Sequence, residues 1–533
     1  GIGSKDVRII PTGCGGGFGS KLDLSYQPYI ALAAWKLNRP VGIVYSRYES
    51  MATTTKRHPS EISIKVGCDE NFKITAIDFH GVFNTGAYAS WGPTVANRVP
   101  VHASGPYQVA NYLAKSTAVH TNNVPAGAFR GFGVPQTAIA LETSLSELAQ
   151  KAGADELNFR MINALRNGTP TVTGQVFSSG VGIIKCLEAV RPAWERAKKY
   201  SNQNNNAVGT SIHKKGVGIA TCWYGCGNTS IANPSTIRIG IRQDGQIILH
   251  QGATDIGQGS NTVITQIVAD AIQTDINSIE LIGPDTDLTP DAGKTSASRQ
   301  TFISGGAASL AGKALREKIL RHANVGDNAR IKSGPTGLYI EDSGERHQVD
   351  LCRLPFDEFG YVLSVQESYD PVTTPLDENG QGDPYGLYGY GVQIAELTVD
   401  IELGTVVIDR ITAAHDVGKA VNPTLVEGQI EGGIAQGIGL ALMEEYQSGV
   451  TDNLHDYLIP TIGDMPDIDI FIVEDEACYV PNGIKGLGEH VLIPTAPAIL
   501  NGIRNASGAK INELPATPAK VLRAIKDVES QSA

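Results

Sequence analysis

The chain has 533 residues, of which 41% are hydrophobic and 18% are charged, with 60 glycines and 27 prolines. This length predicts two large domains or three to four smaller ones with a substantial core. Plentiful apolar residues and aperiodic glycines exclude a disordered or collagen-like chain. Lysine and arginine number 43 against 55 acidic residues, and the resulting net charge of -12 disfavours nucleic acid as a partner.

No apolar run approaches the roughly 20 residues that a membrane-spanning helix needs. The N-terminus lacks the apolar stretch of a secretion signal, and residue 1 is not a methionine, as expected of a chain that is processed or cut from a longer one. The seven cysteines form no disulfide framework, so we expect a reducing, cytoplasmic location.

The first half of the chain is expected to contain a short strand, a glycine-rich loop, a helix, a β-hairpin and then mainly helices, in that order, over residues 7–10, 13–19, 29–37, 62–79 and 137–199. The first helix is expected to end before Pro40, because proline cannot continue a helix. Turn residues separate two runs in which apolar and polar side chains alternate, and this spacing predicts the hairpin.

A polar run without apolar residues at 202–206 marks the main boundary. We expect a first lobe at residues 1–200, a linker at 201–214 and a second lobe at 215–533. After the boundary the same plan recurs as two strands, a glycine-rich loop and a helix, over residues 237–241, 247–250, 252–259 and 263–272. The expected architecture is an α+β fold of two elongated, mixed α/β lobes with a cleft between them.

The glycine-rich loops do not fit the common nucleotide-binding patterns. They miss the G-x-G-x-x-G spacing of dinucleotide-binding turns, and Leu288 stands where a P-loop ending at Lys294 and Thr295 would need its first glycine. Glycine loops that open onto helices still present backbone N–H groups that suit a phosphate or an oxo-anion. For a single loop, a tight turn or a close passage of two backbones is the alternative.

Cys222 and Cys226 have C-x3-C spacing, but no second cysteine pair or histidine lies nearby in the sequence. A structural zinc site normally needs four such ligands. We therefore expect two buried thiols at these positions.

Seven short segments, most of them rich in glycine, lie in order along nearly the whole chain. They read GGGFGSK, AFRGFG, DIGQG, KTSAS, GQIEG, AQGIG and KGLGE, at residues 15–21, 128–133, 255–259, 294–298, 428–432, 435–439 and 485–489. Together they resemble the molybdopterin-binding (large) subunit of the xanthine dehydrogenase and aldehyde oxidase family of molybdenum hydroxylases. The chain also has features similar to those of bacterial nicotinate dehydrogenase and xanthine dehydrogenase.

The resemblance implies the fold of that family's cofactor-binding domain, with molybdopterin between the lobes as the mononucleotide or a form such as the cytosine dinucleotide. It implies that the backbone of Phe18 lies near the molybdenum and that no side chain of this protein ligates the metal directly. The residues implied to bind the cofactor are Gly17, Phe18, Gly19, Arg130, Gln258, Thr295, Ala297, Ser298 and Gln436. Glu489 matches the general base; its alternative is a carboxylate that stabilises a helix N-terminus.

The implied reaction is hydroxylation of an electron-poor carbon of an N-heteroaromatic substrate, with water as the oxygen source. The substrate is expected to be a purine such as xanthine or hypoxanthine, or a nicotinate-like ring. Electrons are expected to pass to iron–sulfur and FAD centres on partner subunits, and a further chain is expected to supply the missing N-terminal part of the molybdenum domain. The alternatives are an aldehyde oxidoreductase of the same family and a non-catalytic paralogous subunit.

Four positions are implied to bind the substrate: Leu22, Arg98, Phe132 and Tyr224. Leu22 stands where purine-oxidising relatives carry a glutamate, which weighs against xanthine. Arg98 matches a substrate-orienting arginine and suits a carbonyl or carboxylate group. Phe132 matches an aromatic residue that packs on a flat ring, and Tyr224 one that lines the pocket. The alternatives are a surface ion pair for Arg98 and core packing for Phe132.

Overall fold

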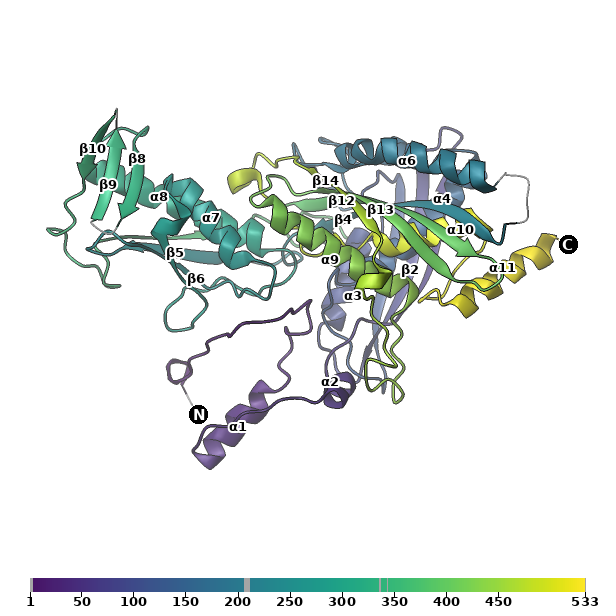
Figure 1. Cartoon of the computed structure of the whole chain (residues 1–533), viewed down its shortest axis with the longest axis horizontal. Helices are drawn as coiled ribbons and strands as arrows, with labels where there is room; N and C mark the ends of the chain where they lie inside the picture. Colours follow the sequence, from purple (N-terminus) through teal and green to yellow (C-terminus); the bar gives the residue numbers. More distant parts are fainter. Residues whose placement is uncertain (1–2, 206–210, 335–336, 343, 533) are drawn as a thin grey trace.

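The computed structural model describes residues 3–205, 211–334, 337–342 and 344–532, and it shows an elongated α+β molecule (Figure 1). Its strands form four sheets, in the orders β1-β2-β3, β14-β13-β12-β4, β11-β5-β6-β7 and β10-β9-β8. The strands are β1 Ser60–Cys68, β2 Ile74–Gly86, β3 Asn111–His120, β4 His213–Gly225, β5 Ser235–Ile241, β6 Ile247–Gln251, β7 Ile279–Ile282, β8 Arg330–Gly334, β9 Gly337–Asp342, β10 Glu345–Gln348, β11 Leu363–Tyr369, β12 Tyr388–Asp400, β13 Val406–Asp416 and β14 Asp467–Val473.

Helices cover these sheets and connect them. The α-helices are α1 Gln27–Leu37, α2 Arg47–Thr53, α3 Gly92–His102, α4 Val134–Ala152, α5 Glu156–Asn163, α6 Ile183–Asn205, α7 Ser260–Ile272, α8 Gly305–Ala323, α9 Pro423–Leu442, α10 Thr495–Ser507 and α11 Pro518–Ser532. Among the described residues, no helix combines the length and the apolar character needed to span a membrane.

The predicted hairpin is confirmed as β1 and β2, which pair antiparallel, and β3 then joins β2 in parallel. Alternate side chains of β2, including Phe79 and Phe83, are fully buried. They pack with apolar residues of α3 and α4 into one core cluster. This alternation follows from the two-residue period of a strand that is covered on one face.

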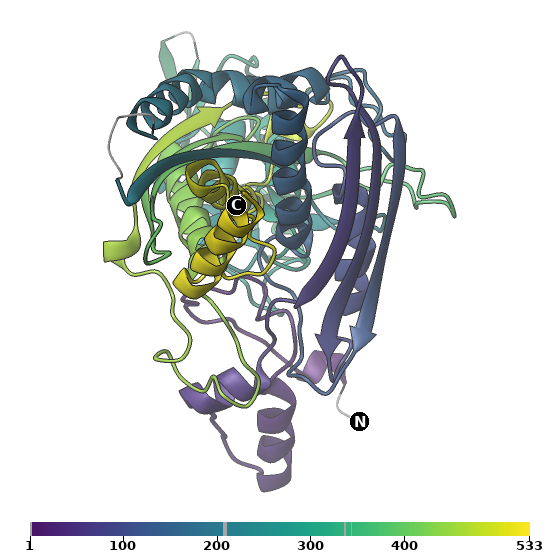
Figure 2. The same cartoon turned by 90° about the vertical axis from the view of Figure 1, so that its right-hand side faces the viewer.

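The central sheet is buried on both faces. In it, β12 pairs with β4 and β13, helix α6 packs on β4 and β12, and α10 packs on the same two strands (Figures 1 and 2). Glycines allow α10 to approach β4 closely, since a Cβ atom on Gly218 would lie 2.1 Å from the carbonyl oxygen of Ala498. A side chain at this position would push the helix away from the sheet.

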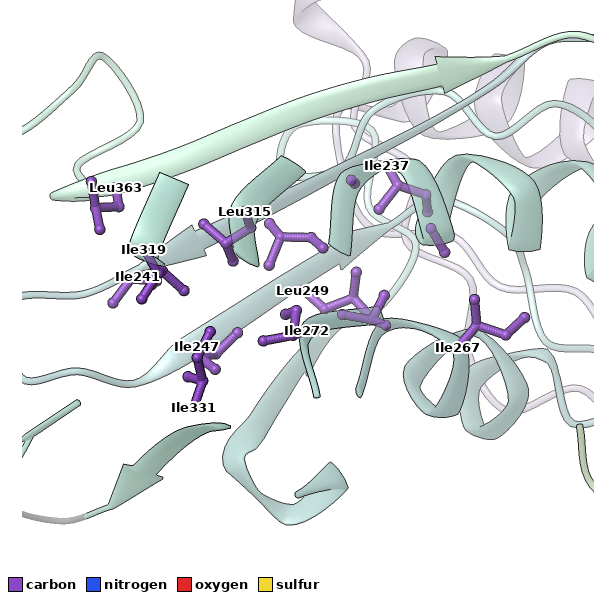
Figure 3. Packing of buried hydrophobic residues seen from close by; sticks show 14 of the residues in the cluster. Ile237, Ile241, Ile247, Leu249, Ile267, Ile272, Leu315, Ile319, Ile331 and Leu363 are labelled. Carbon is purple, nitrogen blue, oxygen red and sulfur yellow. The ribbon is translucent and has the colours of Figure 1, made fainter. Parts of the chain in front are cut away.

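The predicted unit of two strands, a glycine-rich loop and a helix is also confirmed, as β5, β6 and α7. The strands pair antiparallel. Their buried side chains, such as Ile237 and Leu249, pack against Ile267 of α7 and Leu315 of α8 (Figure 3). This cluster anchors the glycine-rich loop between β6 and α7.

The prediction of a strand at residues 7–10 is wrong. This segment joins no sheet and is exposed; instead, the N–H of Ile9 donates to Oγ1 of Thr286 at 2.9 Å, and its carbonyl accepts from the N–H of Thr286 at 3.2 Å. The helix predicted at residues 29–37 is confirmed as α1. Asn38 ends it in the left-handed conformation, with φ of 49°.

The predicted lobe boundary falls at the C-terminal end of α6. The helix continues to Asn205, and residues 206–210 of the predicted linker lie outside the described residues. Trp194 of α6 and Val217 of β4 share one apolar core cluster. The two halves of the chain are therefore packed together at this point, and the division at residues 201–214 stays a prediction.

Candidate active site

Residues from both halves of the chain line one cavity of about 820 Å³. Each of the seven segments that carry the family resemblance contributes to its wall. The residues predicted from the sequence that line the cavity are Gly17, Phe18, Gly19, Leu22, Arg98, Arg130, Phe132, Gln258, Thr295, Ala297, Ser298, Gln436 and Glu489. Only Tyr224 does not reach the cavity wall; it is fully buried behind Glu489 and Arg98.

The first glycine loop lies directly against the segment at residues 128–133. The N–H of Arg130 donates to the carbonyl of Phe18 at 2.7 Å. A Cβ atom on Gly19 would lie 2.6 Å from the carbonyl oxygen of Ala128, so only glycine permits this approach. Phe18 itself has a φ of 50°, a conformation that non-glycine residues rarely adopt and that concentrates at functional sites.

The loop that carries Glu489 is held against a second strained turn. Ala297 and Ser298 have φ values of 54° and 52°. Oγ of Ser298 accepts a hydrogen bond from the N–H of Glu489 at 3.0 Å. A Cβ atom on Gly486 would lie only 1.7 Å from the carbonyl oxygen of Ser298, so the two backbones touch.

Cys222 and Tyr224 of β4, with Cys226 directly after the strand, fix the same loop from behind, because side chains two apart in extended chain point to one face. The thiol of Cys222 donates to the carbonyl of His490 at 3.2 Å, and that of Cys226 to the carbonyl of Gly486 at 3.5 Å. The hydroxyl of Tyr224, between them, donates to Oε2 of Glu489. The expectation that both cysteines are buried thiols is confirmed.

The carboxylate of Glu489 is half-buried and is the only acidic side chain among the residues described as lining the cavity. Besides the hydroxyl of Tyr224, the N–H of Gly131 donates to its Oε2 atom at 3.0 Å. It makes no ion pair with any residue that the structure describes. A carboxylate so placed, with hydrogen-bond donors on one oxygen, is a candidate general base.

Arg130 connects its own loop to the loop that carries Glu489 and to helix α9. Its guanidinium donates to the carbonyl of Gly488, to Oε1 of Gln436 at 3.2 Å, and to both the carbonyl and Oε1 of Gln429 at 3.1 Å. Burial lowers the pKa of Arg130 to about 10, partly offset by Glu489, so the side chain stays charged at neutral pH. It places positive charge beside the glycine loops.

Arg98 is 2% exposed, so the alternative of a surface ion pair is wrong. Its guanidinium donates to the carbonyls of Gly225 at 3.4 Å and Gly227 at 2.6 Å, and it lies 4.5 Å from the ring centre of Tyr224 and 5.0 Å from that of Tyr385. Burial opposes its charge, but the acidic groups of Tyr224, Tyr385 and Glu489 raise the pKa of Arg98 above its ordinary value. Its Nε–H has no partner among the described residues.

The remaining predicted residues divide between the cavity wall and its supports. The ring of Phe132 is only partly buried and meets the ring of Trp91 edge-on at 6.3 Å. The side chain of Gln258 bonds within its own loop, accepting from the N–H of Ile256 at 2.7 Å. Oγ1 of Thr295 donates to the carbonyl of Thr254 in that same loop at 2.8 Å.

Among the residues that line the cavity without having been predicted, three contribute aromatic or polar side chains to the contacts described here. Trp91 precedes α3, Lys294 lies beside the predicted Thr295, and Gln429 belongs to the GQIEG segment. Nζ of Lys294 lies 4.5 Å from the ring centre of Trp91, so these two join the halves of the chain at the cavity. Only the position of Lys294 and Gln429 within recognised segments could have pointed to them.

The cavity suits a large, flat, anionic group that brings its own metal. Glycines form much of its wall, and a Cβ atom on Gly15 or Gly428 would meet no atom within 4 Å, so room remains there. Arginines, glutamines, a hydroxyl and exposed loop backbone supply hydrogen-bond donors. The part of the chain that the structure describes contains no group of three His, Cys, Asp or Glu side chains that could hold a metal ion.

Comparisons with known proteins agree with this chemistry. The molybdopterin cofactor-binding domain family matches residues 1–164 and 186–466. The chain is 34% identical to the xanthine dehydrogenase molybdenum-binding subunit of Escherichia coli O157:H7, over 97% of this chain and 69% of that one. It is 32% identical to a probable xanthine dehydrogenase subunit of Bacillus subtilis, over 98% of this chain and 70% of that one.

Among solved structures, the aldehyde oxidoreductase of Desulfovibrio desulfuricans matches with a TM-score of 0.87 and 28% identity. That match covers 98% of this chain but only 55% of the other one, so this chain corresponds to about half of that enzyme. The predicted α+β fold and the predicted cofactor are both confirmed. The chain belongs to the molybdopterin cofactor-binding family and is a molybdopterin-binding subunit of the molybdenum hydroxylase type.

Proposed function

We propose that this protein is the molybdenum-cofactor subunit of a multi-component dehydrogenase that hydroxylates an electron-poor carbon of an N-heteroaromatic substrate, with water as the oxygen source. The observation that carries this proposal is the placement of Glu489. It is the only acidic side chain lining the cavity among the described residues, and the seven family segments surround it. No described side chain forms an ion pair with this carboxylate, so it is available to accept a proton from a group bound in the cavity.

The residues that would hold the cofactor are those of the glycine-lined wall. They are Gly17, Phe18, Gly19, Arg130, Gln258, Thr295, Ala297, Ser298 and Gln436. Arg130 supplies a fixed positive charge for an anionic tail, and the loop backbones supply N–H donors. Gln258 and Thr295 bond to their own loops, so their part is to shape the wall.

When bound, the molybdenum cofactor supplies the two-electron oxidation that this chain's side chains cannot perform. Glu489 accepts the proton that water must lose as its oxygen is transferred to the substrate. Phe132 and Trp91 present aromatic surface on which a flat ring packs.

The charges around the cavity favour a substrate that carries a carboxylate or carbonyl group. Arg98 keeps an unpaired Nε–H, and Lys294 adds a second positive charge at the wall. Leu22 lines the cavity with an apolar side chain and offers a purine no hydrogen bond. A pyridine carboxylate fits these three residues better than xanthine. The second candidate is an aldehyde, which the apolar Leu22 equally admits.

The proposed enzyme needs partner subunits. We propose that iron–sulfur and FAD subunits accept the electrons in a cytoplasmic complex. The chain spans 69% of the E. coli subunit to which it is similar. Helix α1 projects from the body and buries none of its residues, and its Leu32 and Trp35 are 55% and 63% exposed, which supports contact with another polypeptide (Figure 1).

The test is the substitution Glu489→Gln, which keeps the shape of the side chain and removes the base. In the purified complex, turnover of nicotinate, hypoxanthine, xanthine and benzaldehyde would be assayed with a dye as electron acceptor. We expect loss of turnover by at least about 100-fold, with molybdenum and pterin contents equal to those of the wild type. Substantial residual turnover would refute the role of Glu489, and oxidation of benzaldehyde alone would replace the heteroaromatic substrate with an aldehyde.

A further inference from the structure

The carboxylate of Glu489 is bound unsymmetrically. Both of its side-chain hydrogen bonds, from the hydroxyl of Tyr224 and from the N–H of Gly131 at 3.0 Å, go to Oε2. Within the residues that the structure describes, no group donates to Oε1. The two oxygens of this carboxylate are therefore not equivalent.

The donor of the first bond is held rigidly. Tyr224 is fully buried in the central sheet, where β4 pairs with β12, and Cys222 and Cys226 on the same face bind the loop that carries Glu489. His102 packs 5.7 Å from the ring of Tyr224, and its Nε2 accepts from the N–H of Gly225 at 3.0 Å. These contacts tie the loop to the strand.

The proton of Tyr224 stays on its hydroxyl. Burial raises the pKa of Tyr224 well above its ordinary value, and although the charge of Arg98 opposes that rise, Glu489 adds to it. The hydroxyl is thus a permanent donor near neutral pH and stabilises the charged form of the carboxylate that it binds. The guanidinium of Arg98 lies 4.5 Å from the centre of the same ring.

We propose that Tyr224 is a positioning residue that fixes Glu489 through Oε2, so that Oε1 is the oxygen that exchanges the proton. This inference rests on the proposed function and reassigns Tyr224 from lining the substrate pocket to supporting the base. A phenylalanine at this position would pack equally well but would donate no hydrogen bond.

The test is the pH dependence of kcat/KM for Tyr224→Phe. The acid limb is the fall of kcat/KM on the acidic side of the pH profile. Because the variant loses a hydrogen bond to a charged group, this limb should move to higher pH by about one unit. The matched control is Tyr385→Phe, which also removes a buried hydroxyl beside Arg98; that hydroxyl bonds Thr229 at 2.6 Å and not Glu489, so the acid limb should stay in place. Acid limbs that coincide for wild type and Tyr224→Phe, or that move equally in both variants, would overturn the inference.

Two further measurements keep the test independent of folding and of turnover. In the cofactor-free protein, the infrared difference spectrum against Glu489→Gln isolates the carboxyl band of Glu489. In Tyr224→Phe the band of the protonated form should persist to higher pH than in the wild type. Bands that titrate at the same pH in both proteins would contradict the proposal. If Tyr224→Phe does not fold, fluorotyrosine at position 224 keeps the shape of the side chain and is a stronger hydrogen-bond donor. The acid limb of kcat/KM should then move to lower pH. An active Glu489→Gln variant would refute the proposed function. If Glu489→Gln is inactive but the acid limb of Tyr224→Phe does not move, only the role of Tyr224 is refuted.

Discussion

Arg98 gives the clearest prediction about single residues. Its guanidinium is buried between two tyrosine rings, and its Nε–H has no partner among the described residues. Arg98→Lys keeps the charge but loses the planar fork that binds a carboxylate. For a carboxylate-bearing heteroaromatic we expect kcat/KM to fall about 10- to 100-fold, because a hydrogen bond to a charged group contributes about 1.5–3 kcal/mol.

The neutral substrate benzaldehyde is the internal control for this variant. Its kcat/KM should fall by less than tenfold, since it carries no carboxylate for Arg98 to bind. Equal losses on both substrates would show that Arg98 only supports the carbonyls of Gly225 and Gly227. Steady-state kinetics on the assembled complex measure both values.

Individual residues could be predicted where a short motif identified them. Arg130 and Glu489 were predicted in this way, and both line the cavity. Their contacts could not be predicted, because the bond from Arg130 to Gly488 joins residues 358 positions apart. Tyr224 shows the limit: its motif indicated an aromatic residue near the pocket, but only the pairing of β4 places its hydroxyl on Glu489.

Among the structural elements, the loop at residues 485–489 depends on close contact between two backbones. A Cβ atom on Gly486 would lie 1.7 Å from the carbonyl oxygen of Ser298, so Gly486→Ala must displace one of the two loops. We expect the free energy of unfolding to fall by about 2 kcal/mol or more, as for other overpacked sites, together with loss of turnover. Urea unfolding monitored by circular dichroism measures the first effect.

Gly488→Ala is the matched control. The nearest atom to a Cβ atom at Gly488 is Oγ of Ser298 at 3.7 Å, an ordinary contact. The free energy of unfolding should therefore change by less than about 1 kcal/mol. If both variants unfold at the same urea concentration as the wild type, the contact with Ser298 does not hold the loop.

Elements with local signals were predicted correctly, and those that depend on distant partners were not. The β1–β2 hairpin and the unit of β5, β6 and α7 follow from alternation, turn residues and helical periodicity. Residues 7–10 carry the same apolar β-branched pattern but find no strand to pair with. A strand needs a partner, and its own sequence does not specify one.

For the whole molecule, buried histidines predict acid sensitivity. Burial strongly lowers the pKa values of four histidines, to about 4 for His58, about 3 for His102 and His415, and well below 6.5 for His490. In the unfolded chain these side chains bind protons below about pH 6.5, whereas in the folded protein they stay neutral. Stability is therefore fully present above about pH 6.5 and is lost as the pH falls toward 4.

The free energy of unfolding should decrease by about 1.4 kcal/mol per pH unit for each of these histidines across that window. Urea titrations at several pH values from about 7.5 down to about 5 measure the slope. His490→Asn should make the slope shallower. A free energy that does not depend on pH would contradict the buried, neutral state of these side chains.

The two halves of the chain bring the seven family segments to a single cavity, and this convergence is the feature of the whole molecule on which the function depends. The sequence predicted facing lobes with a cleft, because two glycine-rich loops follow similar strands. It could not predict the packing of Lys294 on Trp91 or of Arg98 on Tyr385, since those contacts depend on how the halves are packed.

The most direct measurement is the molybdenum and pterin content of the protein, purified with its natural partner chains from cells supplied with molybdate. Metal analysis and pterin fluorescence after oxidation should give close to one molybdenum and one pterin per chain. Arg130→Ala removes the side chain that joins two cavity loops to helix α9, and it should lower both contents. Purified wild-type protein that contains neither molybdenum nor pterin would contradict the account.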